Sequence, residues 1–231
     1  MSIEDPTHRW AVHAAADNTH NRTLELLQKR FPDLTGLSIL DLPCGAGAFS
    51  AKLAQLGANV TPMDIEAVEP FYGDSSKRVL GDANLPLPFP DGFFDAVVTI
   101  EGIEHLENPS LFLRECARVT RPGGWILLST PNVDSFRSRK YVFLHGYHHY
   151  FGPWSDTHKD SWHLLPVDMV FLRGAAKKAN LEIAEVTVNE MKGKNLFKEL
   201  LRPLLTRSLP QYMRGPVPFY GNVIIYALKK P

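Results

Sequence analysis

Two acidic side chains flank a glycine-containing segment in the first third of the chain. Asp41 opens the segment Asp41–Ala48, which contains Gly45 and Gly47, and Asp64 follows it 23 residues after Asp41. The glycines let the backbone approach a ligand closely. An acid at position 64 can accept hydrogen bonds from both hydroxyls of a ribose. This spacing predicts a nucleoside-binding site.

The charge of this loop helps to distinguish between nucleoside ligands. Dinucleotide-binding enzymes use a similar loop and close it with a third small residue, a place that Ser50 takes here. A carboxylate at Asp41 would repel a pyrophosphate, whereas it would attract the ammonium of a methionine or the charge of a sulfonium. The loop has no lysine, which weighs against a P-loop site. Taken alone, the pattern also fits a tight turn without a ligand.

A second group with chemical potential is the segment Glu101-Gly102-Ile103-Glu104-His105. His105 can take a proton near neutral pH, so it is our candidate general base, with Glu104 beside it. The alternative is structural: His105 and Glu104 brace the loop or cap the next helix. Both interpretations stay open on the residues alone.

Apolar strand patterns alternate with helical patterns along the chain. Strands are expected at Leu37–Leu42, Val60–Met63, Arg78–Leu80, Asp95–Ile100, Trp125–Ser129, Glu182–Val188 and Asn222–Leu228. Helices are expected at Ala48–Leu56, Asn108–Val119 and Pro166–Ala179, and Thr23–Phe31 is expected to be the end of an N-terminal helix. Pro62 predicts a bulge or bend in the second strand, and residues 121–124 predict a turn.

This order predicts an α/β fold with a mostly parallel seven-stranded sheet, helices on both faces, and an antiparallel pair at one side. Ligands bind beyond the carboxyl ends of the strands in such sheets. The glycine loop, Asp64 and the 101–105 segment all lie there.

Whole-chain properties narrow the functional class. The 231 residues suit one domain, 1–231, and 25 basic side chains balance 25 acidic ones, so no duplex nucleic acid is expected as a partner. Two cysteines, Cys44 and Cys116, give no disulfide framework and favour a cytoplasmic protein. No signal peptide and no membrane-spanning segment are expected, because neither the N-terminal residues nor any later stretch forms a long enough apolar run.

Taken in their order along the chain, these segments resemble the motifs of the class I methyltransferases, which have a Rossmann-like fold. The resemblance covers about Leu37 to Pro131, in the segments Ile39–Gly47, Asp64, Gly81-Asp82-Ala83, Phe94–Val98 and Arg121–Trp125. It implies S-adenosylmethionine as the cofactor. Asp41 and the backbone of Gly45 and Gly47 would hold the methionine end, and Asp64 would hold the ribose.

The resemblance assigns the rest of the cofactor site as well. Asp82 and Ala83 would contact the adenine, and Glu101 is also expected to bind the cofactor. Pro43 departs from the family pattern and bears on the conformation of the loop.

The 101–105 segment is also similar to quinone-biosynthesis O-methyltransferases and to small-RNA 3′-end methyltransferases. In those families an acid-acid-histidine group helps bind a divalent metal, which would position and acidify the accepting hydroxyl. Here the group is Glu101, Glu104 and His105, and the fourth ligand would be His158 or His163. Because metal-free relatives carry a similar Glu-His pair, metal dependence stays open.

Three segments are expected to extend the domain: an N-terminal helical extension at 1–36, an aromatic and histidine-rich insert at 133–165, and a helical excursion at 189–219. The insert could enclose an aromatic, sugar or polyprenyl acceptor, or pack its own rings over the sheet. The apolar stripe in Leu196–Leu209, kinked at Pro203, could touch a membrane, cover the site, form a dimer contact or simply pack.

The sequence is therefore compatible with three functions. The first is methyl transfer to a small-molecule, glycan or lipid-linked acceptor, most simply at oxygen. The second is an NAD(P)-dependent oxidoreductase that uses the same glycine loop. The third is a non-catalytic protein that keeps the nucleoside pocket.

Overall fold

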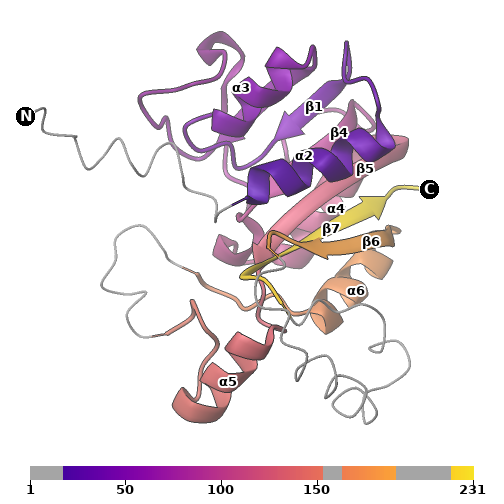
Figure 1. The fold of residues 1–231 in the computed structure, drawn as a ribbon. Helices are drawn as coiled ribbons and strands as arrows, with labels where there is room; N and C mark the ends of the chain where they lie inside the picture. Colours follow the sequence, from indigo (N-terminus) through magenta and orange to yellow (C-terminus); the bar gives the residue numbers. More distant parts are fainter. Residues whose placement is uncertain (1–17, 153–162, 191–219) are drawn as a thin grey trace, which may run out of the picture.

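Seven strands form one twisted sheet in the computed structural model, which describes residues 18–152, 163–190 and 220–231 (Figure 1). The strand order is β3-β2-β1-β4-β5-β7-β6. The five strands from β3 through β2, β1 and β4 to β5 run parallel to one another, whereas β7 is antiparallel to both β5 and β6. The strands are β1 (Ser38–Asp41), β2 (Asn59–Asp64), β3 (Val79–Leu80), β4 (Phe94–Ile100), β5 (Thr120–Pro131), β6 (Glu182–Val188) and β7 (Val223–Lys229). The expected sheet, with its antiparallel pair, is confirmed.

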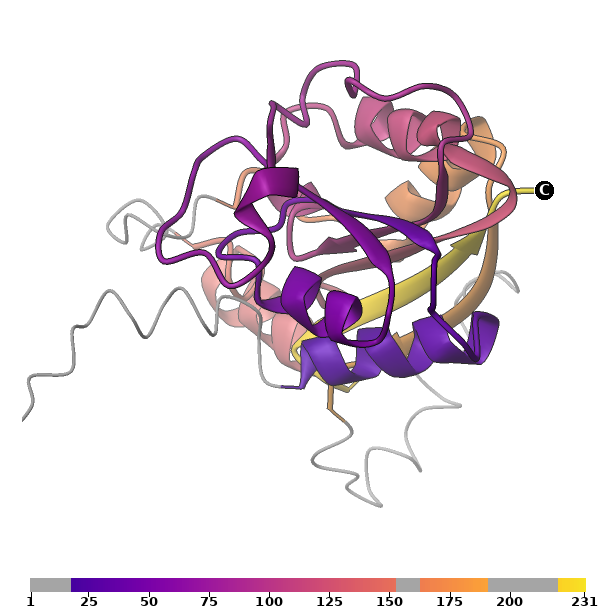
Figure 2. The same ribbon diagram turned by 90° about the horizontal axis from the view of Figure 1, so that it is seen from above.

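Helices cover both faces of the sheet, as expected (Figure 2). Helices α2 (Thr19–Arg30) and α3 (Ala48–Gln55) pack on one face, and α4 (Pro109–Val119) and α6 (Met169–Lys178) pack on the other. Neighbouring strand residues point to opposite faces, so Ile39 joins the core under α2 and α3 while Leu40 joins the core under α4 and α6. Helix α5 (Phe136–His145) protrudes from one end of the sheet (Figure 1).

Capping residues fix where two of the helices begin. Asn108 caps α4 by accepting a hydrogen bond from the Leu111 N–H, with proline in the first turn, as the sequence indicates. The expectation that Pro166 opens the next helix is wrong. Asp168 has extended backbone and accepts from the Phe171 N–H, so α6 begins at Met169.

Pro62 does not produce a bulge, contrary to expectation. The pairing of β1 with β2 runs in unbroken register from Ser38 and Asn59 to Asp41 and Pro62. Backbone groups alternate sides along a strand, and the Asp64 carbonyl accepts from Gly81 on the β3 side. The Pro62 nitrogen therefore faces that side too, where β3 pairs only with Met63 and Asp64, so no ladder hydrogen bond is lost.

The segment 121–124 lies inside a strand rather than in a separate turn. Strand β5 runs from Thr120 to Pro131, and the register against β4 shifts between Phe94 and Ala96. Gly123 has φ of 76° and donates its N–H to the Lys230 carbonyl. The extra residues of β5 therefore form an irregularity in its pairing with β4.

Parts of the three additional segments fall outside the described residues. Helix α2 belongs to the 1–36 extension and α5 to the 133–165 insert. Trp154, His158 and Trp162 lie outside the description, as do the Leu196–Leu209 stripe and nearly all of the 189–219 excursion. Within the described ranges, every helix is too short or too polar to span a bilayer.

Candidate active site

A cavity of about 460 Å³ lies beyond the carboxyl ends of β1, β2, β3 and β4. This is the place that the alternation of strands and helices predicts. Many of the residues that the sequence predicts as ligand-binding or catalytic line this cavity. They are Asp41, Gly45, Asp64, Asp82, Ala83, Glu101 and His105. Gly47 and Glu104 are not among its lining residues. The volume is in the range of small-molecule sites, which hold roughly 300–1,000 Å³.

The glycine loop uses its own N–H groups to hold its shape. Cys44 donates to the Met63 carbonyl at 2.9 Å, and Gly47 donates to the Cys44 carbonyl at 2.8 Å. Gly45 donates to a carboxylate oxygen of Asp64 at 2.8 Å, and the other oxygen accepts from Ile65 at 2.8 Å. These three loop N–H groups are therefore engaged inside the protein, and one of them already faces a negative charge. Such a loop is poorly suited to cradle a phosphate.

Asp41 is a buried carboxyl group at the wall of the cavity. Only 1% of its surface is exposed, and Ser50 donates a hydrogen bond to it. Burial raises the pKa of Asp41 to about 7; the negative charge of Asp64 adds to this, and hydrogen bonds from Ser50 oppose it. A cation placed in the cavity would favour the charged form of Asp41.

Gly47 shapes the loop from behind the cavity. Its φ of 77° is a conformation that glycine adopts easily, and it precedes the first residue of α3. A Cβ at this position would lie 2.6 Å from the ring of Phe71 and 2.9 Å from the Gly73 nitrogen. The visible requirement for glycine here is thus close packing of the 71–73 segment. Pro43, the departure from the family pattern, lines the cavity next to this loop.

Glu104 and two histidines form a compact group beside the cavity. One ligand atom from each of Glu104, His105 and His163 lies within 4.8 Å of the others, and His105 also lines the cavity. The Glu104 backbone carbonyl accepts hydrogen bonds from Leu164 and Leu165, which brings His163 to this place. His158, the other histidine considered as a fourth ligand, lies outside the described residues.

The side chain of Glu104 is fully buried and only partly satisfied. Thr130 donates to one carboxyl oxygen at 3.0 Å, whereas Oε1 has no hydrogen-bond partner within the described residues. Burial raises the pKa of Glu104 to about 8, and the charge of Glu101 adds to this. A buried carboxyl oxygen without a partner is costly, so a ligand at Oε1 would relieve that cost.

His163 presents one nitrogen to this group. Its Nδ1 lies 3.0 Å from the Tyr150 carbonyl oxygen, which can only accept, so Nδ1 carries the proton. Burial and the neighbouring His105 lower the pKa of His163, which favours the neutral ring. Nε2 is then the nitrogen with a free lone pair, as a metal ligand requires.

Comparisons with known proteins agree with this geometry. Residues 40–128 match the family described as the methyltransferase domain. A ubiquinone biosynthesis O-methyltransferase from Xanthomonas oryzae pv. oryzae is 38% identical over 109 residues, which cover 43% of this chain and 45% of that protein. The chain therefore spans less than half the length of this relative.

Solved structures extend the similarity to the whole fold. A crystal structure described as a sarcosine dimethylglycine methyltransferase from Galdieria sulphuraria has a TM-score of 0.65 at 15% identity, covering 98% of both chains. The cyclase SpnF has a TM-score of 0.59 at 18% identity, covering 92% of this chain and 80% of that one. The chain is thus similar to a methyltransferase domain over residues 40–128. These structural likenesses establish its fold, and the match over 40–128 covers the glycine loop and the 101–105 segment.

Outside the matched residues, the chain carries a cluster of aromatic and imidazole rings. His149 lies 4.6 Å from the Tyr141 ring and 4.0 Å from the Tyr150 ring, and Phe151 lies 5.2 Å from His163. His163 in turn lies 4.8 Å from His105. The insert thus packs its rings against each other and ends at the group beside the cavity.

His20 is a lining residue that sequence reasoning missed. It lies in the first turn of α2, before the Thr23–Phe31 stretch that the sequence predicts as the end of an N-terminal helix, and its ring centroid is 5.1 Å from that of Phe49. No local pattern at His20 indicates a ligand. Only packing of α2 against the start of α3 brings it to the cavity.

Proposed function

We propose that the protein is an S-adenosylmethionine-dependent methyltransferase that methylates an oxygen of a small-molecule acceptor. The observation that carries this proposal is one cavity that places Asp41, Asp64 and Asp82 at the ends of successive strands, with His105 on its wall. When bound, S-adenosylmethionine supplies an electrophilic methyl group on a sulfonium. The buried Asp41, whose charged form a cation would stabilise, fits its cationic end.

The lining residues divide along the cofactor by their order in the sheet. Asp41 and the Gly45 backbone hold the methionine end, and Asp64 accepts from the ribose hydroxyls. Asp82 and Ala83, which follow β3, contact the adenine, and Glu101 lies at the boundary with the acceptor. Gly47 contributes by allowing the loop to close, as its contact with Phe71 indicates.

Methyl transfer needs one proton to leave the acceptor. His105 accepts the proton of the acceptor hydroxyl while that oxygen bonds to the methyl carbon and the carbon–sulfur bond breaks. The products are a methyl ether, S-adenosylhomocysteine and a protonated His105, which then returns its proton to water. Alignment of oxygen, carbon and sulfur supplies much of the rate enhancement.

We further propose that Glu104, His105 and His163 hold a divalent metal. The partnerless Oε1 of Glu104 and the tautomer of His163 fit such an ion. A metal here would lower the pKa of the acceptor hydroxyl. His105 would then be a ligand rather than the base, so the two roles are alternatives that metal removal distinguishes.

Quinone-like phenols are the acceptors we propose first. The relatives named ubiquinone biosynthesis O-methyltransferase support this choice, and the ring cluster from Tyr141 to His163 offers apolar faces to an aromatic ring. Lipid-linked and glycan acceptors remain the alternatives to be screened.

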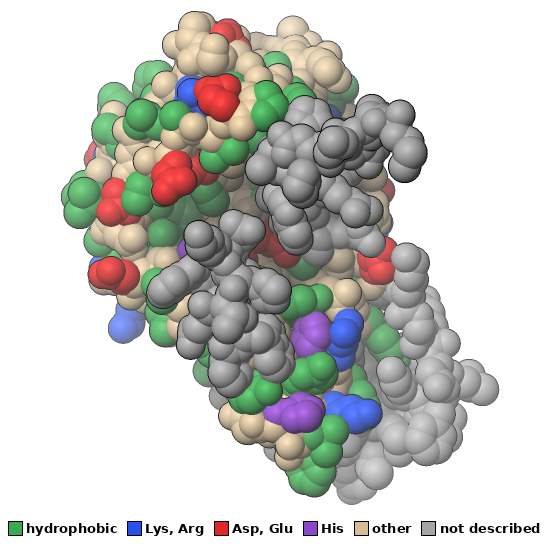
Figure 3. Space-filling model, turned by 90° about the vertical axis from the view of Figure 1, so that its left-hand side faces the viewer, with side chains coloured by type: hydrophobic (Ala, Val, Ile, Leu, Met, Phe, Trp, Pro, Cys, Tyr) green, Lys and Arg blue, Asp and Glu red, His purple; other side chains and the backbone are tan. Residues whose placement is uncertain are grey.

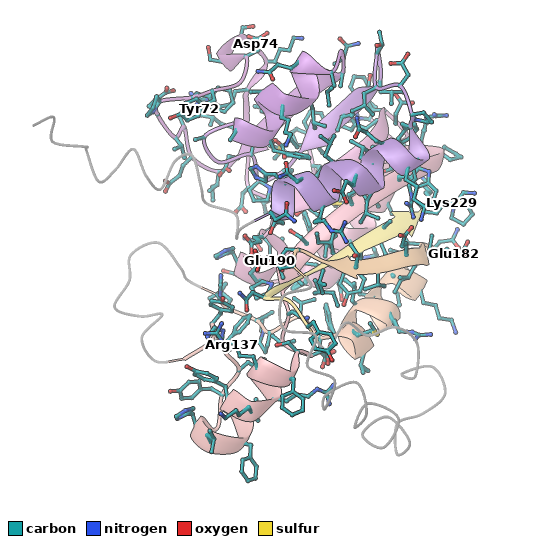
Figure 4. The ribbon with its side chains drawn as sticks, viewed as in Figure 1. Tyr72, Asp74, Arg137, Glu182, Glu190 and Lys229 are labelled. Carbon is teal, nitrogen blue, oxygen red and sulfur yellow. The ribbon has the colours of Figure 1, made fainter. Side chains whose placement is uncertain are left out.

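Contact with a membrane surface is proposed through α5. Several side chains of α5 extend away from the rest of the structure (Figure 4), and Phe143 is 88% exposed. The lower part of the face in Figure 3 shows hydrophobic side chains next to basic ones and histidines, and α5 carries Arg137, Arg139 and Lys140. Flotation with anionic vesicles tests this contact, and a homodimer through the same helix is the competing outcome.

A cytoplasmic location is proposed as well, because Cys44 and Cys116 are both free and buried. The small-molecule acceptor, and not duplex nucleic acid, is the expected partner.

Binding titration followed by an acceptor screen tests the function. Calorimetry should show S-adenosylhomocysteine binding and no NAD binding; the reverse result would favour the oxidoreductase alternative, which nothing in the comparisons supports. Transfer of a labelled methyl group to phenols then separates an enzyme from a non-catalytic nucleoside-binding protein. The second step is necessary because the same fold occurs in a protein named as a cyclase.

A further inference from the structure

The methionine tail of the proposed cofactor carries a carboxylate as well as an ammonium, and the cavity offers it few partners. Its walls include four acidic side chains, Asp41, Asp64, Asp82 and Glu101, and no lysine or arginine among the residues described. A carboxylate brought into this acidic cavity needs a hydrogen-bond donor to offset repulsion.

Three backbone donors of the glycine loop are already engaged inside the protein. The N–H groups of Cys44, Gly45 and Gly47 all donate to acceptors within the protein. In the described lining, the side chains with nitrogen donors are His20, Asn84 and His105. Asn84 follows Asp82 at the adenine end, and His105 lies with the acceptor group.

His20 lies at the Asp41 end of the cavity. Its ring contacts Phe49 with a centroid distance of 5.1 Å, and the next residue, Ser50, donates to the Asp41 carboxylate. Asp82 follows β3, two strand spacings from β1, or about 10 Å across the sheet. His20 therefore lies where it can contact the amino-acid tail of the cofactor and not its adenine.

We propose that His20 binds the carboxylate of the cofactor's amino-acid tail, while Asp41 faces the ammonium. This inference rests on the proposed function. Together the two side chains match the two charges of a zwitterion, so the site selects adenosyl amino acids over adenosine thioethers without a tail.

Two ligands and two variants test the proposal by calorimetry. S-adenosylhomocysteine has the tail, whereas 5′-methylthioadenosine keeps the adenine, ribose and thioether without it. His20→Phe keeps a ring against Phe49 but removes the donors, and His20→Gln retains a donor. His145→Phe makes the same change on exposed α5 as a control.

The expected result is specific to the tail. His20→Phe should weaken S-adenosylhomocysteine binding about tenfold or more, as loss of a charge-assisted hydrogen bond does, and leave 5′-methylthioadenosine binding unchanged. His20→Gln should recover part of the loss, and His145→Phe should bind both ligands like the wild type.

Three outcomes would overturn it. If His20→Phe binds S-adenosylhomocysteine as tightly as the wild type does, His20 does not contact the carboxylate. An equal loss for both ligands assigns His20 to the shape of the pocket. A wild-type protein that binds neither ligand rejects the proposed function itself, and the inference with it.

Discussion

Replacing Asp41 with asparagine should stabilise the empty protein and weaken cofactor binding at the same time. Burial raises the pKa of this carboxyl from 3.8 to about 7 in the folded protein. Because Asp41 binds its proton more tightly in the folded state than in the unfolded state, the free energy of unfolding falls as pH rises from 3.8 toward 7. Ionised Asp41 therefore costs the empty protein roughly 4 kcal/mol at pH 8, at about 1.4 kcal/mol per pH unit.

The asparagine side chain has nearly the same shape and no charge. Asp41→Asn should raise the melting temperature of the empty protein at pH 8, by an amount reduced by the weaker hydrogen bond from Ser50. The gain should largely disappear near pH 3, where Asp41 is mostly protonated in both the folded and the unfolded state. Differential scanning calorimetry at the two pH values measures it.

Binding should change in the opposite direction. Loss of a charged partner for the ammonium should weaken S-adenosylhomocysteine binding about 10- to 100-fold at pH 8, with 5′-methylthioadenosine unaffected. Wild-type affinity should fall as pH drops below about 7, because a proton then competes with the ammonium for Asp41. Comparing the wild type with Asp41→Asn isolates this contribution from that of other titrating groups. A variant that loses stability at pH 8, or binds the tailed ligand normally, would refute the reasoning.

The other predictions address the base, the metal and the loop. His105→Ala should lower turnover about 10²- to 10⁴-fold, as loss of a general base does, with S-adenosylhomocysteine affinity nearly unchanged; unaltered turnover in a methyl-transfer assay would make His105 structural. Exhaustive chelation separates the two roles of His105: loss of activity that added divalent metal restores assigns His105 as a metal ligand, and full activity after chelation leaves it as the base. Glu104→Gln should weaken metal binding in calorimetry. Gly47→Ala should destabilise the fold by about 1–3 kcal/mol because of its positive φ and the contact with Phe71. Gly174→Ala in α6, where a Cβ meets nothing within 4 Å, should stabilise it by about 0.4–1 kcal/mol in the same denaturation assay.

The order of elements and the place of the site were predictable because both depend on local patterns. Apolar runs, glycine turns and the Asn108-Pro109 start mark the strands and helices. Parallel strands then bring their carboxyl ends to one edge, so residues at the ends of β1, β2 and β4 had to meet. Pro62 was misjudged because its harmless position depends on the length of β3, a neighbour that sequence alone does not measure.

Contacts between distant segments were harder to predict. His163 reaches Glu104 through backbone hydrogen bonds from Leu164 and Leu165, and the resemblance to metal-binding families could name His163 only as one of two choices. His20 carries no signal because its role follows from how α2 packs on α3. Gly47 looked like a ligand-contact glycine, since close approach to a ligand and close approach to Phe71 demand the same residue.

The most direct test of the central claim is a crystal structure with S-adenosylhomocysteine bound. We predict that the ammonium of its tail lies against Asp41 and that both ribose hydroxyls contact Asp64. Adenosine bound in the opposite direction, or a ligand phosphate seated on the 41–48 loop, would contradict it.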